Sequence, residues 1–575
     1  MQALFGELRD LLEQVPSVNA FETIVFFIDY HARDEEQRAQ VEAEWIPYAL
    51  GKLQDNWPDR TRECPRVLLE GYEANTVVWA PLVASVNFEA ESMSAKRLKQ
   101  LVAAEHMKCV MGLNLCGARS KWEQLEELST HSPFGDLKYL AFRRAIKPAD
   151  YDSLATFFGS KMLSSVTHLS FKEWDKIKPD VYTLLEQSFP LENLTCFDFT
   201  GPRVISPRSL KALLGSGRLT GLEELYFERH DLSKDYKGVL KVLAGDKGLK
   251  NLKRLHLTGA DSKDIQAFVK TTHFESLEVL KLHTEGWDVK SMQVFAKSSG
   301  FPSLKRFVLM IRQDQSEVLQ ALAGSELLQQ LTSLEVRVIH NDAEHFESYA
   351  EHARAFISAL DGASLQRLKW CEDINKMSRE EGFEQGDLYR VTRSLLEGFS
   401  ALNLEALRGF AYEQIATYQT LKDYRVAHQL EGGGSAAVLT QASWFQALDE
   451  FLLKGEMFGD EDVKAIQASD VRCKYLGLEV ECSLAQLKAF VDAGKLDDVR
   501  QLRFFSFAFS ASEFENYIIE IASKLRLRGV RVPHNYSVYL ERSEKMCAMG
   551  GWVWGQREFV FTDTYASWLS EPLGF

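Results

Sequence analysis

One short pattern of apolar residues recurs through half of the chain and limits the folds that the chain can adopt. In each copy, an apolar residue is followed by two variable positions, a second apolar residue, one variable position and a third apolar residue. The first residues of successive copies lie 25 to 34 residues apart. A repeat of this length is typical of a solenoid, in which each unit packs only on its neighbours. The eleven regular copies are Val83-Val86-Phe88, Val110-Leu113-Leu115, Leu137-Leu140-Phe142, Val166-Leu169-Phe171, Leu194-Phe197-Phe199, Leu222-Leu225-Phe227, Leu252-Leu255-Leu257, Leu277-Leu280-Leu282, Leu304-Phe307-Leu309, Leu331-Leu334-Val336 and Leu365-Leu368-Trp370.

Within one unit, the sequence changes from a strand pattern to a helix pattern. Leu255 and Leu257 alternate with Arg254 and His256, which predicts a strand with one buried face. In residues 265–269, apolar side chains recur every three or four positions, which predicts a helix. Neither element can bury its apolar side alone, so neighbouring units should stack their strands into a parallel sheet and their helices into a second layer.

These units resemble the ribonuclease-inhibitor-like class of leucine-rich repeats, in which strand and helix alternate over about 28 residues. The segments 44–48 and 57–60 are also similar to stretches that precede such repeats in uncharacterised bacterial proteins. The resemblance implies an α/β fold: a right-handed horseshoe solenoid with a parallel β-sheet on its concave face and helices on its convex face. This class places an Asn or Cys three residues after the third apolar position, where it bonds neighbouring loops. The chain instead has Ala118, Ala145, Trp174, Pro202, His230, Ala260, Glu285 and Arg312 there, so we expect loops that vary between repeats.

Changes in the pattern divide the chain into five predicted segments. Residues 1–75 lack the motif and show helical spacing in 2–15 and 34–53, so we expect a helical N-terminal cap, followed by leucine-rich repeats in 76–371. Residues 372–435 break the period and end in a glycine run, which predicts an irregular insertion and joint with degenerate repeats.

Farther along the chain, the motif returns. Within the insertion, residues 387–399 have helical spacing and a strand could begin at Leu404. Copies beginning at Tyr475, Val499 and Leu527 predict C-terminal leucine-rich repeats in 436–540, after an amphipathic helix over 438–453. The aromatic residues of 541–575 predict a C-terminal cap.

Charge and cysteine content narrow the functional classes. The formal net charge is −15, so overall charge cannot drive binding to nucleic acid or to an anionic membrane. The N-terminus has no basic segment followed by an apolar stretch, and the longest early apolar run, 24–28, is far shorter than a membrane span. Eight cysteines stand apart without a Cys-x-x-Cys pair, which favours reduced thiols in the cytoplasm.

The sequence contains no nucleotide-binding glycine loop, nucleophile elbow or His-Glu-x-x-His motif. We therefore predict no cofactor, no metal and no enzymatic activity. Cys371-Glu372-Asp373 offers an alternative, because it resembles part of the active-site signature of bacterial leucine-rich-repeat ubiquitin ligases, in which the thiol is the nucleophile. The simpler interpretation is a packed cysteine at the end of a strand.

Two further patterns have both a functional and a structural interpretation. His340, His345 and His352, with Asp342 and Glu344 between them, are residue types that suit a divalent metal, although Asp342 could equally cap a helix. Residues 550–555, Gly-Gly-Trp-Val-Trp-Gly, could frame a stacking site or form a turn against the last repeat.

The strand positions between the apolar residues should point to the concave face, where a partner would bind. From 252 to 371 these positions include six Lys or Arg and one acidic residue. Adjacent parallel strands lie about 4.8 Å apart, so the basic side chains should form one stripe from Arg254 to Lys369. The stripe either binds an acidic partner or is neutralised by carboxylates of the same chain, such as those of 372–387. The candidate partner-binding residues are Tyr139, Arg143, His168, Tyr226, Arg254, His256, Lys281, His283, Arg306, Arg337, Arg367 and Lys369.

Together these features predict a non-catalytic protein-binding scaffold whose partner is another protein with an acidic surface. A nucleic-acid partner is disfavoured, because the basic positions lack interleaved aromatic residues on the same strands. Two alternatives stay open: an effector enzyme that uses Cys371, and a regulator of a GTPase or nuclease, which rests on analogy of fold alone.

Overall fold

A computed structural model of the chain describes most residues up to Phe504. The described residues are 2–12, 18–57, 62, 64, 77–87, 105–115, 129, 134, 136–142, 151–171, 179–199, 207–227, 238–245, 247–257, 262–271, 274–284, 287–340, 345–374, 385–415, 436–454, 460–473, 475–479, 485, 488–489, 492–494, 501–504 and 529–531. None of the helices among them is both long enough and apolar enough to span a membrane. The chain divides into two compact units between Leu257 and Thr258, and each is described separately below.

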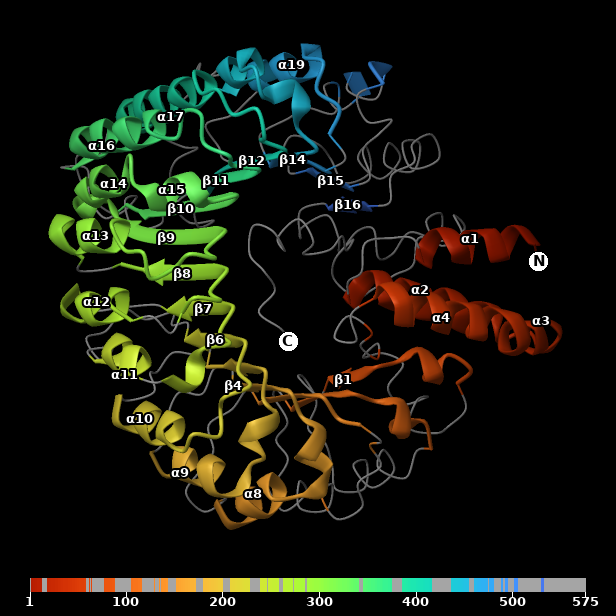
Figure 1. Cartoon of the computed structure of the whole chain (residues 1–575). Helices are drawn as coiled ribbons and strands as arrows, with labels where there is room; N and C mark the ends of the chain where they lie inside the picture. The colour runs from red at the N-terminus through yellow and green to blue at the C-terminus, as the bar shows by residue number, and fades with distance from the viewer. Residues whose placement is uncertain are drawn as a thin grey trace. The chain divides into compact units, whose positions relative to one another are not determined.

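The first unit begins with a layer of helices and continues as a series of parallel strands (Figure 1). Each strand pairs in parallel with the next one along the chain, with no crossover. The helices that follow the strands lie on one face of the sheet. The elements are α1 (Gln2–Leu12), α2 (Val18–His31), α3 (Glu35–Gln40), α4 (Ile46–Asn56), β1 (Ser85–Asn87), β2 (Gly112–Leu115), β3 (Tyr139–Phe142), α8 (Tyr151–Phe158), β4 (His168–Phe171), α9 (Pro179–Ser188), β5 (Cys196–Asp198), α10 (Pro207–Gly215), β6 (Glu224–Phe227), α11 (Val239–Gly245) and β7 (Arg254–Leu257).

The N-terminal helices form an aromatic core of their own before the repeats begin. Trp45 is fully buried, and its ring stacks on Phe27 at 5.8 Å between centroids. The two helical stretches predicted from the sequence are present, and α2 is an additional helix that contains the early apolar run. The backbone next to the sheet also covers the first strand: Ala84 and Ser85 donate hydrogen bonds to the carbonyl of Arg62, and Cys64 donates to that of Ser85.

The second unit repeats the same strand–helix order (Figure 1). Its strands also pair in parallel, each with the next in sequence. Neighbouring helices, such as α16 and α17, pack side by side on one face of the sheet. The elements are α12 (Ser262–Val269), β8 (Val279–His283), α13 (Val289–Ala296), β9 (Arg306–Arg312), α14 (Glu317–Leu322), α15 (Glu326–Gln330), β10 (Ser333–Ile339), α16 (Phe346–Ser358), β11 (Arg367–Asp373), α17 (Gln385–Ser400), β12 (Gly409–Ile415), β13 (Glu450–Lys454), α19 (Asp460–Ala468), β14 (Tyr475–Glu479), β15 (Gln501–Phe504) and β16 (Gly529–Arg531).

The apolar motif residues form the core between sheet and helices in both units. The second residue of each copy is aligned with its counterparts on the adjacent strands, so these side chains stack into a continuous ridge. In the first unit, the third residue adds a row of stacked phenylalanines, and the centroid of the Phe171 ring lies 5.4 Å from that of Phe142 and 5.3 Å from that of Phe199. The ridge residues with no exposed surface are Val86, Leu113, Leu140, Leu169, Phe197, Leu225 and Leu255 in the first unit and Leu280, Phe307, Leu368, Phe410 and Phe451 in the second.

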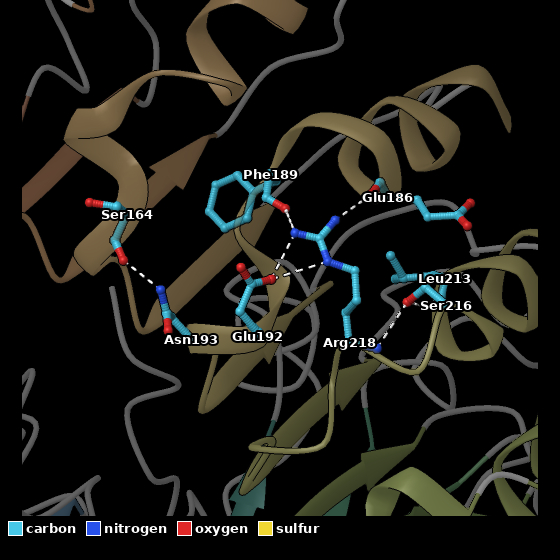
Figure 2. Close-up of polar contacts among 8 residues, drawn as sticks. All are labelled: Ser164, Glu186, Phe189, Glu192, Asn193, Leu213, Ser216 and Arg218. Carbon is cyan, nitrogen blue, oxygen red and sulfur yellow. Dashed lines mark hydrogen bonds and ion pairs between the residues drawn. The ribbon is translucent and has the colours of Figure 1, made fainter.

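Polar side chains join consecutive repeats at a position other than the Asn or Cys position of the repeat class that the sequence resembles. In four repeats, the residue just before the first apolar position donates a side-chain hydrogen bond to a backbone carbonyl of the preceding repeat. Asn193 bonds Ser164 at 2.5 Å, as Figure 2 shows, and Asn251 bonds Thr220 at 2.9 Å. Ser165 and Gln330 make the equivalent bonds to Leu137 and Phe301. Of the eight positions named above, where the family has Asn or Cys, Arg312 alone lies within the described residues.

Arg218 is a second link between repeats of the first unit (Figure 2). Its guanidinium donates to the carbonyls of Glu186 and Phe189, at 2.5 and 2.7 Å, and pairs with the carboxylate of Glu192 at 2.7 Å. These carbonyls lie at the C-terminal end of α9, where the last carbonyls of a helix lack partners within the helix.

The structure confirms an α/β fold with an all-parallel sheet covered by helices, as expected for a leucine-rich-repeat solenoid. It corrects the sequence prediction in residues 372–480. The helix predicted over 387–399 is present as α17 and β12 follows it, so the segment 372–435 is not irregular throughout. The strand there is β12, at 409–415, and its motif copy begins at Leu407 instead of Leu404. The next copies begin at Leu448 and Cys473.

The predicted helix over 438–453 is wrong. Short 3₁₀ turns occupy 436–441 and 445–447, and β13 follows at 450–454. The error arises because the first two apolar residues of a motif copy, here Leu448 and Phe451, have the three-residue spacing of a helix. The copy read at Tyr475 lies two residues too late, since Leu476 is the residue aligned with Phe451. The glycine run of 432–434 and the predicted C-terminal cap lie outside the described residues.

We expect Phe171→Ala to lower the free energy of unfolding by about 3–5 kcal/mol, because it opens a cavity in the phenylalanine row. Tyr30→Ala is the matched control, since that ring is 69% exposed and its loss should cost little. Urea unfolding followed by circular dichroism measures both variants. Equal effects of the two substitutions would contradict the proposed role of the row.

Candidate functional site

The face of the sheet opposite the helices, here called the helix-free face, carries the residues between the apolar motif positions. Parallel pairing places equivalent positions of adjacent strands side by side, about 4.8 Å apart. In the second unit, Arg306 and Arg367 lie in one row on either side of Ser333, Glu335 and Lys369 lie in the next row, and Arg337 lies in the third. The basic residues of this unit are therefore spread over three rows and do not form one stripe.

On the first unit, two aromatic–histidine pairs occupy the helix-free face. Tyr139 and His168 are partly exposed, their ring centroids lie 4.7 Å apart, and the Thr167 hydroxyl contacts His168 Nδ1 at 2.8 Å. Tyr226 and His256 are buried, with their ring centroids 4.6 Å apart. Arg143 lies outside the described residues.

Glu224 anchors the polar contacts beside the second of these pairs. Its carboxylate accepts hydrogen bonds from the Tyr226 hydroxyl at 2.6 Å and from Arg254 at 2.9 Å. Burial, and then the charge of Glu224, raise the pKa of the Tyr226 phenol, which therefore stays protonated. In the neighbouring repeats, Ser170 donates to Asp198 at 2.9 Å, and both are buried. The sequence did not single out that pair.

Strands β8 and β9 carry a basic and apolar patch. Lys281, Arg306 and Arg312 are partly exposed, as is Met310, whereas Val308 is buried between them. The helix-free positions of these two strands contain no Asp or Glu. His283, the last residue of β8, is buried.

Strands β10 to β13 differ, because their basic residues pair with carboxylates of neighbouring strands. Lys369 is only 4% exposed and lies 3.5 Å from Glu335 and 3.2 Å from Glu413. Burial alone lowers the pKa of Lys369, but these two carboxylates outweigh it and raise the pKa, so the amine is charged. Arg367, whose side chain is 48% exposed, reaches Glu450 at 3.4 Å across Gly409, which has no side chain to block it.

This pairing tests the alternative that the chain neutralises its own basic residues. In β10–β13, the carboxylates that pair with these basic residues within the described part of the chain belong to strands of the sheet. Arg337 adds a longer contact of 3.7 Å to Glu335, so two cations and two carboxylates meet at the centre of this cluster. Residues 375–384, which the sequence suggested as a source of neutralising charge, lie outside the described residues.

Cys371 lies on the same face, next to Lys369, and has no exposed surface. Burial raises the pKa of its thiol to about 12, although the nearby charge of Arg337 acts in the opposite direction. A nucleophilic cysteine requires accessibility and a lowered pKa, so Cys371 has the environment of a packed thiol.

The histidine pattern of 340–352 does not converge on one point. His340 is buried on the helix side of the sheet, and His352 contacts the Ser316 hydroxyl at 3.0 Å. Across the part of the chain that the structure describes, no three His, Cys, Asp or Glu side chains are arranged to hold a metal. The suggested cap, Asp342, and the glycine–tryptophan stretch of 550–555 lie outside the described residues.

Comparisons with known proteins give similarity of structure only. No protein-family model matches the chain, and no curated protein matches it. Among solved structures, a chain of the yeast Rad7–Elc1 complex is similar with a TM-score of 0.33 and 13% identity, over 62% of this chain and 77% of that one. A Bacteroides fragilis protein is similar with a TM-score of 0.29 and 15% identity, over 45% of this chain and 73% of that one.

We expect the Cys371 thiol to resist iodoacetamide in the folded protein at about pH 8, because a thiol with a raised pKa stays protonated there. Cys109, which is exposed, is the internal control and should react. Mass spectrometry of tryptic peptides, before and after unfolding in urea, measures labelling at each cysteine. Rapid labelling of Cys371 in the folded protein would contradict a buried, protonated thiol and would support Cys371 as a nucleophile.

We expect Lys369→Met to destabilise the protein by about 3–5 kcal/mol, because it removes a cation that pairs with two buried carboxylates, while the contact of Arg337 to Glu335 is longer, at 3.7 Å. Lys305→Met removes an exposed lysine that pairs with Glu278 at 3.6 Å and should change stability little. Thermal unfolding at matched pH compares the two. A stable Lys369→Met variant would show that Lys369 is not needed to compensate the charges of Glu335 and Glu413.

Proposed function

We propose that the protein is a non-catalytic scaffold of the ribonuclease-inhibitor-like leucine-rich-repeat class and that it binds a partner protein with an acidic surface. One observation carries the proposal. The helix-free positions of β8 and β9 hold three basic residues, Lys281, Arg306 and Arg312, and no acidic residue, in a chain whose net charge is −15. Asp314, which follows β9, pairs with Arg312 at 3.1 Å. We call Lys281, Arg306, Val308, Met310 and Arg312 the basic patch.

The contrast with the neighbouring strands supports an external partner at the basic patch. On β10–β13, the basic residues already have carboxylates of the same sheet beside them. On β8 and β9, the other helix-free positions are apolar or histidine, and the carboxylate that pairs with Arg312, that of Asp314, lies beyond the end of the strand. An acidic segment would find positive charge there, whereas most of the protein surface would repel it, and such contrast favours one docking orientation.

The side chains of the basic patch also have the chemistry of binding hot spots. Arginines make directional bonds to carboxylates and are frequent at the centre of interfaces. Met310 offers a flexible apolar contact between them. Tyr139 and His168 would give the first unit a separate aromatic contact point, since both rings are partly exposed.

A binding role also fits the environment of the residues that suggested catalysis. The Cys371 thiol is buried and protonated, so we propose no thioester chemistry. The scattered cysteines, of which the five described ones form no disulfide, favour a reducing compartment such as the cytoplasm. We propose no regulation of a GTPase or nuclease, because that alternative rests on analogy of fold alone.

The test reverses the charge of the basic patch. The variant Lys281→Glu with Arg306→Glu should lose the partner, because two attractive charges become repulsive; affinity should fall at least about tenfold. Partners are captured from the native host with wild type and variant baits, compared by quantitative mass spectrometry, and the purified partner is then titrated by calorimetry at low and high salt.

The control variant is Lys290→Glu with Lys297→Glu, which makes the same change in net charge at exposed positions on and after α13. It should retain the partner. Equal capture by wild type and the patch variant would refute the proposed site. Equal loss in both variants would indicate a general charge effect.

A further inference from the structure

A cluster of buried polar side chains lies behind strands β10–β12, on the helix side of the sheet. Along β11 the side chains alternate between the two faces, so Leu368, Trp370 and Glu372 all point into the core. Glu372 therefore occupies a core position that is apolar on the two preceding strands, Ile311 on β9 and Val338 on β10, and Gln414 lies beside it on β12. It has no exposed surface.

Three side chains from three different elements meet the Glu372 carboxylate. The Tyr349 hydroxyl of α16 donates to Oε1 at 2.8 Å, and the Tyr412 hydroxyl of β12 donates to Oε2. His340, which follows β10, places Nε2 at 3.5 Å from Oε1, within ion-pair distance. All three side chains are buried.

A second layer of hydrogen bonds fixes these groups in place. The indole of Trp370 donates to the Tyr349 hydroxyl at 3.2 Å. The Gln414 amide donates at 2.8 Å to the hydroxyl of Thr392, which brings α17 into the cluster. The cluster thus links three strands with both helices that cover them.

Burying an isolated carboxylate is costly, so the charge of Glu372 must be compensated by these groups. Burial raises the pKa of Glu372, but the neighbouring imidazole of His340 and the hydroxyls of Tyr412 and Tyr349 outweigh it and hold the pKa below its ordinary value. Burial and the charge of Glu372 raise the pKa of both tyrosines, which therefore remain hydrogen-bond donors.

We propose that Glu372 and its partners form an acid-releasable latch, which holds α16 and α17 against β10–β12 while Glu372 is ionised and frees the helix pair when it is protonated. Protonation of Glu372 removes the negative charge that faces His340. It also turns one carboxylate oxygen from a hydrogen-bond acceptor into a donor, although the hydroxyls of Tyr349 and Tyr412 already donate to this carboxylate. The titratable groups that face Glu372 within the described residues are His340, Tyr349 and Tyr412; α17 contributes the neutral Thr392. Lys369, Cys371 and Asp373 lie on the opposite face of β11.

The sign of the pH effect follows from the lowered pKa. A carboxyl group whose pKa is lower in the folded state stabilises that state above the pKa of the unfolded chain, about 4.5, and loses this contribution as the pH falls. The latch should therefore be closed near neutral pH and open in acid. This effect is independent of partner binding at the basic patch.

Hydrogen–deuterium exchange of peptides from α16 and α17 tests the latch, with α13 of the same unit as reference and with correction for the intrinsic exchange rate. Glu372→Gln should increase exchange in α16 and α17 about tenfold or more at about pH 7, because charged hydrogen bonds are lost. Wild type should lose protection in these two helices between about pH 7 and about pH 3, whereas Glu372→Gln should show little further loss. Glu397→Gln, an exposed change on α17, should behave like wild type.

Two results would overturn the proposal: unchanged protection of α16 and α17 in Glu372→Gln, or the same acid-dependent loss in that variant as in wild type. If Glu372→Gln does not fold, Tyr349→Phe replaces it. That variant keeps the charge but removes one donor to it, so the pKa of Glu372 should rise and protection should be lost at higher pH than in wild type. An unshifted pH profile in Tyr349→Phe would also refute the latch.

Discussion

Burial of the second apolar residue of each motif copy against its counterparts on the adjacent strands is the interaction on which the rest of the structure depends. A strand of three to seven residues, such as those observed, cannot bury its apolar side alone. Once the ridge residues align, the strands pair in parallel at fixed register. That register determines which polar side chains become neighbours on the helix-free face, although they are dozens of residues apart in sequence.

Strand β11 shows how one short segment can serve two purposes. Its alternating side chains place Arg367, Lys369 and Cys371 on the helix-free face and Glu372 in the core. Each buried charge is matched by opposite charge or by hydroxyl donors from adjacent strands and helices. Because an unmatched buried charge would destabilise the fold by several kcal/mol, these pairings also restrict how β10–β12 can move relative to one another.

The candidate site was only partly predictable from the sequence. Alternation along the strands correctly indicated that Lys281, Arg306 and Arg367 would share one face of the sheet. It did not reveal that Lys369 would lie between Glu335 and Glu413, because the strand suggested at Leu404 begins at Gly409 and Glu413 was therefore missing from the set. Alternation also places Glu372 in the core, but nothing local in the sequence identifies Tyr349 and Tyr412 as its partners.

The sequence by itself determined the repeat, the strand–helix order of each unit and the parallel sheet, because apolar periodicity is a local property that burial converts directly into structure. It also determined which strand positions point away from the core. Only the tertiary structure decided which of those positions pair with carboxylates of adjacent strands and where a buried carboxylate finds its hydrogen-bond donors. Those outcomes depend on register between strands whose motif copies lie 34 to 42 residues apart in this region, and on helices that fold over them, so no local pattern records them.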